Sequence, residues 1–142
     1  MSIVAKALST LDHERKDDLM RVPDSAVPHT GPPLRVHLDI GTGGRAVVTA
    51  QGELDMLTSP TLAAAIDEAL DHAPALLVVD LTGTTFFGSA AMLVLADSRR
   101  RAGGTTALRI AGGRIVRRVL DIAYPDQPLT LHPTVHDALS AP

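Results

Sequence analysis

The sequence predicts a single α/β domain, with a mixed sheet of four to five strands flanked by about four helices. The chain has 142 residues, which is the length of one ordinary domain. From residue 34 onward, short apolar runs with strand periodicity alternate with segments whose apolar residues repeat at helical spacing. Because a parallel strand needs a crossover connection, strands that alternate with helices indicate a mostly parallel sheet.

The first two elements are expected to form a β-hairpin. Apolar residues stand at positions 34, 36, 38 and 40 and alternate with polar ones, which is typical of a strand with one buried face. The glycines of Gly41–Gly44 predict a turn, and Arg45–Gln51 predicts the returning strand. This hairpin begins the domain.

A helix is predicted from Ser59 to about His72. Ser59 can cap it, and Pro60 fits its first turn, where a missing N–H costs nothing. The apolar residues 62, 66 and 70 repeat at helical spacing and define the buried face. The acidic residues of this helix, Asp67 among them, are expected to face away from the core.

The run Leu76–Leu81 is apolar almost throughout and predicts the central strand, covered on both faces. Thr82–Gly88 is expected to be a loop, and Ser89–Ala102 a helix that ends at Gly103. Three arginines fall in the last turn of this helix, where the helix dipole favours cations.

Four further elements complete the expected domain. The pattern predicts a strand over Thr105–Ala111, a helix over Arg114–Ile122, a short strand over Leu129–Leu131 and a closing helix over Pro133–Ser140. The domain therefore spans residues 34–142. Residues 1–33 combine a charged stretch with four of the ten prolines, and predict an N-terminal tail, either mobile or laid on the domain as a strap.

Composition excludes several classes of function. Thirteen basic residues oppose sixteen acidic ones, so the chain lacks the basic excess of a nucleic-acid binder. The absence of cysteine excludes disulfides, zinc–cysteine sites and thiol catalysis. The longest apolar runs fall far short of the roughly 20 residues of a membrane helix, and no signal-peptide centre is present. We expect a cytoplasmic protein without a membrane or direct DNA contact.

Basic residues and glycines also need an explanation. Seven of the thirteen basic residues lie between Arg99 and Arg118. A solvated helix face accounts for them; a nucleic-acid patch would require the arginines of both helices to share one face. The glycine pairs match no nucleotide-binding fingerprint, and His132 and His136 do not form a metal-binding framework, so neither a cofactor nor a metal is expected.

Ser89 is the leading candidate for a functional residue. It follows the central strand and a glycine-containing loop, and it begins a helix, where free N–H groups and the positive end of the dipole favour a phosphate. A phosphoryl group adds about −1.5 to −2 charges, which changes the electrostatics of a binding surface without refolding the domain. The simpler interpretation is that Ser89 only caps the helix.

The runs Gly52–Asp55, Leu77–Gly83 and Thr85–Ser89 resemble, in order and separation, the bacterial anti-sigma factor antagonists, which have a STAS domain. The resemblance covers roughly residues 34–140. It implies a serine, matched by Ser89, that an anti-sigma factor kinase phosphorylates. The unphosphorylated antagonist would bind this anti-sigma factor and free a sigma factor. Phosphorylation would break that complex, and a metal-dependent serine phosphatase would restore it by returning the unphosphorylated form. The resemblance implies no enzymatic activity.

One run departs from the family pattern. The family has Asp-Ser-Ser/Thr-Gly at this turn, whereas this chain has Gly88-Ser89-Ala90-Ala91. Loss of the carboxylate could weaken phosphorylation and leave a constitutive binder. Alternatively, Gly88 supplies a loop conformation with positive φ, and the kinase provides all of the chemistry.

The expected partner surface surrounds Ser89. Asp55 either shapes this surface or caps the helix near Ser59, and one of the two adjacent phenylalanines is expected in the core and the other toward the partner. The predicted partner-binding residues are Asp55, Phe87, Gly88, Ser89, Ala90 and Met92. The protein is expected to be a monomer or a weak dimer. The alternative function is a small-ligand or nucleotide-binding module that holds a phosphate at the same helix start.

Overall fold

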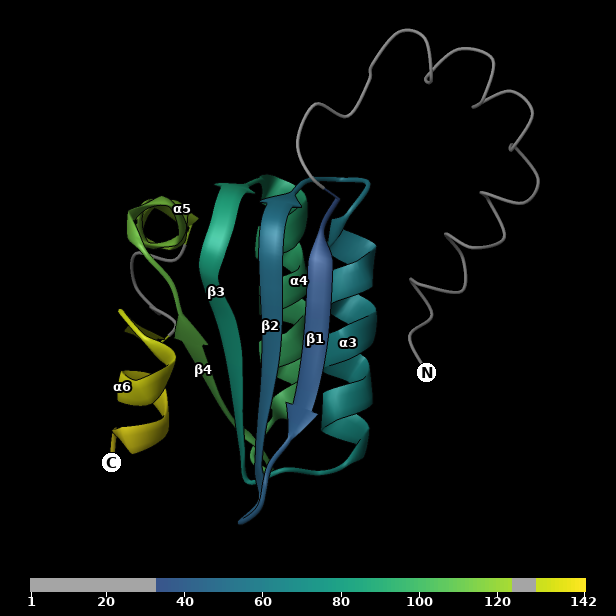
Figure 1. Ribbon diagram of the computed structural model, residues 1–142, viewed down its shortest axis with the longest axis vertical. Helices are drawn as coiled ribbons and strands as arrows, with labels where there is room; N and C mark the ends of the chain where they lie inside the picture. The colour runs from purple at the N-terminus through teal and green to yellow at the C-terminus, as the bar shows by residue number, and fades with distance from the viewer. Residues whose placement is uncertain (1–32, 124–129) are drawn as a thin grey trace, which may run out of the picture.

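Figure 1 shows the fold in a computed structural model, which describes residues 33–123 and 130–142. The predicted tail lies outside these ranges except for Pro33, and so does Leu129. No helix in the described ranges is long and apolar enough to cross a membrane. The elements, in chain order, are β1 (Arg35–Ile40), β2 (Arg45–Leu54), α3 (Ser59–Asp71), β3 (Leu76–Phe87), α4 (Ser89–Ala102), β4 (Ala107–Ala111), α5 (Arg114–Ala123), β5 (Leu131–His132) and α6 (Val135–Ser140).

The strands of the described chain form one five-stranded sheet in the order β1-β2-β3-β4-β5. β1 is antiparallel to β2, and the other neighbours are parallel. Helices α3 and α4 pack together on one face, α6 lies beside β4, and α5 lies at the end of the sheet where β3 finishes (Figure 1). The predicted α/β class, with a mixed sheet and four flanking helices in the described ranges, is confirmed.

Alternation along β3 divides the core into two parts. Leu77 and Val79 are fully buried in the larger part, with Leu62 and Ile66 of α3 and Leu95 of α4. The intervening side chain of β3 faces the other way and joins a smaller cluster under α6. The core is built mainly from aliphatic side chains and contains few aromatic rings. Burial of each large aliphatic side chain contributes about 1.5–3 kcal/mol to stability.

β2 and β3 are longer than the sequence pattern predicts, and the prediction of a loop over Thr82–Gly88 is wrong. β3 continues to Phe87 and pairs with the end of β2, where Leu54 lies opposite Phe87. The register shifts twice, because β3 has an extra residue at two points. At the first shift, the Asp80 carboxylate accepts hydrogen bonds from the Thr82 N–H (3.0 Å) and hydroxyl (2.6 Å). Bulges of this kind interrupt the period-two pattern.

Two helix starts also differ from the prediction. The cap position of α3 is Thr58, and Ser59 is instead the first residue of the helix and is buried. α6 begins two residues after Pro133, because the Thr134 hydroxyl accepts a hydrogen bond from the Asp137 N–H (3.0 Å) and caps the helix. The structure therefore corrects the capping role expected for Ser59.

The expectation that Asp67 faces away from the core is wrong. Asp67 is 5% exposed, and its carboxylate forms an ion pair with Arg101 in the last turn of α4. A buried carboxylate requires such a partner, because an unpaired charge is strongly disfavoured away from water. The pair joins α3 to α4.

Candidate functional site

The carboxyl ends of β2 and β3 bring two loops together at one end of the sheet, which we call the apex. The first loop, Asp55–Thr58, leads into α3, and the second, at Gly88, leads into α4. The Gly88 N–H donates a hydrogen bond to the Leu54 carbonyl oxygen (2.9 Å), which holds the second loop against the end of β2, where the first loop begins. In open α/β sheets this is the end where binding sites form.

Asp55 organises the first loop. Its carboxylate oxygen Oδ1 accepts hydrogen bonds from the N–H groups of Leu57 and Thr58, each at 2.9 Å. The Asp55 N–H in turn donates to Thr58 Oγ1 (2.9 Å), and the Thr58 hydroxyl donates to the Glu53 carbonyl oxygen (2.7 Å). Asp55 thus fixes the turn that precedes α3, and the two residues between Asp55 and Thr58 project from it.

Exposed apolar side chains surround these loops. Met56 and Leu57 are each 78% exposed, Phe86 is 50% exposed, and Leu93, one turn along α4 from Ser89, is 64% exposed. We call these four residues the apical patch. Sequence analysis missed Met56, Leu57 and Leu93. The available signal was a pair of large apolar residues in a short turn, where no buried face exists to receive them.

Ser89 is exposed on the first turn of α4, and the expectation that it caps the helix is wrong. The cap position is Gly88. Within residues 33–123 and 130–142, the Ser89 side chain makes no hydrogen bond. Its hydroxyl is therefore accessible, beside the unpaired N–H groups that begin a helix.

Gly88 has a steric role and not the backbone role considered from the sequence. Its φ of −94° and ψ of −179° are extended, so the expectation of positive φ is wrong. A Cβ atom at this position would lie 3.0 Å from Cε2 of Phe86 and 3.4 Å from the Leu54 carbonyl oxygen. The Phe86 ring occupies the space that a larger residue at position 88 would need.

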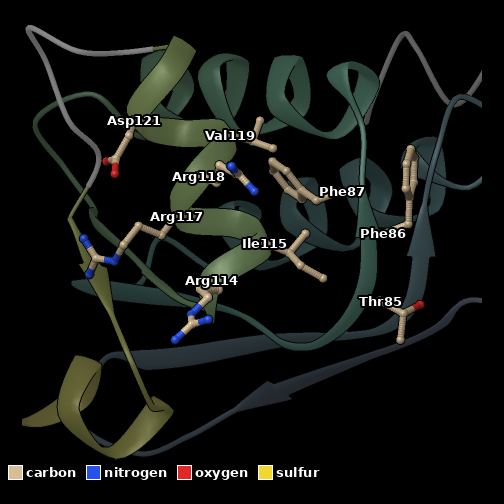
Figure 2. Close-up of a pocket in the computed structure, with 9 residues that line it drawn as sticks. All are labelled: Thr85, Phe86, Phe87, Arg114, Ile115, Arg117, Arg118, Val119 and Asp121. Atoms are coloured by element: carbon tan, nitrogen blue, oxygen red, sulfur yellow. The ribbon is translucent and has the colours of Figure 1, made fainter.

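One phenylalanine is buried and the other exposed, as expected. However, the predicted partner-binding residue Phe87 is the buried one. Phe87 is 4% exposed and belongs to the core cluster, and Figure 2 shows its ring directed toward α5. Phe86 carries the exposed ring. Met92 is also partly buried against the core. Of the predicted partner-binding residues, the structure brings Asp55, Gly88, Ser89 and Ala90 together at the apex.

The arginines of the two helices do not share one face. Arg99–Arg101 lie at the end of α4 farthest from Ser89, whereas Arg114 begins α5 just beyond the carboxyl end of β4. Because α4 runs antiparallel to the strands it connects, the two groups lie toward opposite ends of the sheet. In the part of the chain that the structure describes, no group of three His, Asp or Glu residues is placed to hold a metal ion.

Comparison with known proteins identifies the family. Residues 33–138 match the STAS domain family model. The chain is a member of the STAS domain family. This STAS domain is 34% identical over 98 residues to the anti-sigma-F factor antagonist RsfB of Mycobacterium tuberculosis, with 68% of the chain and 80% of RsfB covered. It is 33% identical over 116 residues to the putative anti-anti-sigma factor Rv2638 of the same organism, with 79% of this chain and 76% of Rv2638 covered.

Solved structures agree. The STAS domain superposes on an anti-sigma factor antagonist from Mycobacterium paratuberculosis with a TM-score of 0.70 and 32% identity, covering 76% of this chain and 92% of the other. The anti-sigma factor antagonist SpoIIAA, in its unphosphorylated form, shares the fold with a TM-score of 0.59 and 21% identity. The match covers 74% of this chain and 93% of SpoIIAA. The predicted resemblance is confirmed, and this STAS domain belongs to the anti-sigma factor antagonists.

Proposed function

We propose that the protein binds an anti-sigma factor through its apex, and so frees a sigma factor for transcription, until phosphorylation of Ser89 ends the binding. The observation that carries this proposal is the position of Ser89. Its accessible hydroxyl lies on the same helix face as Leu93 and next to the loop that carries Met56 and Leu57. Exposed apolar side chains that surround a modifiable group are suited to a regulated protein interface.

The switch requires no change of fold. A phosphate on Ser89 is stabilised by the N-terminus of α4, since the helix dipole favours negative charge there. The same phosphate opposes burial of the apical patch, because about −1.5 to −2 charges would have to lose water at the interface. An unpaired, desolvated charge in an interface costs several kcal/mol, which corresponds to a loss of affinity of about 100-fold or more.

The covalent step belongs to the partner. The Ser89 hydroxyl oxygen attacks the γ-phosphorus of ATP held by an anti-sigma factor with serine kinase activity, ADP leaves, and a base of the kinase takes the hydroxyl proton. A serine phosphatase reverses the step by hydrolysis, which releases inorganic phosphate and returns the hydroxyl. The protein itself catalyses nothing in this scheme and acts in the cytoplasm.

The test compares wild type, Ser89→Ala and Ser89→Asp in binding to the anti-sigma factor kinases of the native host, by isothermal titration calorimetry. We expect wild type and Ser89→Ala to bind alike and Ser89→Asp to bind at least about 100-fold more weakly. Intact-mass analysis after incubation with kinase and ATP should show one added phosphoryl group on wild type and none on Ser89→Ala.

Two results would refute the proposal. Equal binding by all three proteins, without phosphoryl transfer, would indicate an antagonist that lacks this switch. Stabilisation by ATP or GTP alone, without any kinase partner, would favour the ligand-binding alternative. Ser89 lines neither the groove beside α5 nor the smaller pocket at β4, so the pocket geometry does not favour that alternative.

A further inference from the structure

A groove of about 780 Å³ lies between the end of β3 and α5 (Figure 2). Phe87 forms part of its floor, and Ile115 and Val119 line it from α5. Ile115 is 45% exposed, and Ile122, two turns along the helix, is 76% exposed. Positions 115, 119 and 122 fall on one side of a helix, so an exposed apolar stripe continues from the groove along α5.

The groove has a positive rim. Arg114, Arg117 and Arg118 all line it, against one carboxylate, Asp121. Within the described ranges, none of these three arginines forms an ion pair, whereas Arg100 and Arg101 of α4 are paired with Asp97 and Asp67. Residues 39–97 hold eight acidic side chains and a single arginine, so the positive charge of the domain is concentrated in its C-terminal part. There the arginines of α5 form a group separate from those that end α4.

We propose that this groove binds an acidic amphipathic helix of a partner protein. The apolar stripe offers contacts at the i, i+4 and i+7 spacing by which a helix lies in a groove. The arginines lie on one side of this stripe and would pair with carboxylates along one side of the partner's apolar face. A nucleic acid fits less well, because it would meet an apolar floor. This surface adjoins the apical patch, because Phe86 belongs to both, but Ser89 does not line the groove and the proposed binding there does not depend on the proposed function.

The test is an NMR titration of the full chain, labelled with ¹⁵N, with two synthetic amphipathic helical peptides. The peptides share one leucine face and differ only in carrying Glu or Lys at the flanking positions. We expect the Glu peptide to cause saturable shifts at Phe87, Ile115 and Val119, and the Lys peptide to cause none. Arg114→Glu/Arg118→Glu should weaken binding about tenfold or more.

A matched control separates local from overall charge. Arg45→Glu/Arg100→Glu makes the same change in net charge at the opposite end of the sheet, and we expect its affinity to stay within about twofold of wild type. Ile115→Ser keeps all three arginines and should also weaken binding. The proposal is overturned if the Lys peptide binds as well as the Glu peptide, or if the two double variants weaken peptide binding equally. It is also overturned if no saturable shifts occur in the groove, or if a DNA duplex binds there and the Glu peptide does not.

Discussion

The two ends of the sheet differ in how their loops are stabilised. At the end opposite the apex, which we call the base, the Gly44 carbonyl oxygen accepts hydrogen bonds from the N–H groups of Ala75 (2.8 Å) and Leu76 (3.1 Å). The Thr106 hydroxyl donates to the Pro74 carbonyl oxygen (2.6 Å). At the apex, internal hydrogen bonds instead hold a loop that exposes apolar side chains. The base is thus closed by hydrogen bonds within the chain, whereas the apex leaves large apolar side chains exposed.

The largest loss of stability is expected near the base. Arg101→Ala would leave the buried Asp67 carboxylate without its ion pair, and should lower the free energy of unfolding by about 2–3 kcal/mol, less than for a fully buried pair because Arg101 is partly exposed. Guanidinium unfolding measures this. Arg100→Ala is the control, since its pair with Asp97 is exposed and should contribute about 0.5 kcal/mol or less. Equal effects of the two substitutions would contradict the assigned role of Asp67.

Asp55→Ala should lower both the stability of the domain and its affinity for the anti-sigma factor. It removes the acceptor for the N–H groups of Leu57 and Thr58, and we expect a loss of about 1–2 kcal/mol in unfolding free energy together with weaker binding of the anti-sigma factor. Asp55→Asn keeps a side-chain oxygen at this place and should recover most of both. If Asp55→Asn behaves like Asp55→Ala, then charge and not the turn is the important property.

Gly88→Ala tests the packing of Phe86 over Gly88. The added methyl group would displace the ring, and because the ring is half exposed and able to move, the expected loss is about 1 kcal/mol or less. A double-mutant cycle with Phe86→Ala measures the coupling by thermal unfolding. The methyl group should cost less when the ring is absent; strict additivity would show that the ring does not limit residue 88.

The smallest change in stability is expected in the apical patch itself. Met56→Ser and Leu57→Ser should each change the unfolding free energy by no more than about 0.5 kcal/mol, because both side chains are mostly in water. Each should nevertheless weaken binding of the anti-sigma factor about tenfold. Ile40→Ser is the matched control, an exposed apolar residue at the base that should leave binding unchanged. An equal effect of Ile40→Ser would remove the distinction between the two ends.

The fold was largely predictable from local patterns. The helical spacing over α3 and the apolar run that begins β3 are each strong within a few residues, and both were confirmed. The second half of β3 was not predictable, because it is held by pairing with β2 and carries two extra residues. No window of sequence contains that information.

The same extra residues limited prediction of the site. Each one reverses the face taken by the side chains that follow, so the sequence could not decide which of Phe86 and Phe87 enters the core. The position of Ser89 was predictable because a helix start follows from local signals. The exposure of Met56 and Leu57 depends on the Asp55 turn, and the burial of Asp67 depends on a partner in another helix.

The order of the strands in the sheet is also their order along the chain. Each strand therefore pairs with the one made just before it, and no later strand has to enter between two earlier ones. During synthesis on the ribosome, the β1–β2 hairpin can form first, and every subsequent strand can add to an edge that already exists. We expect the sheet to assemble progressively from the N-terminal side, without waiting for the C-terminal residues to be translated.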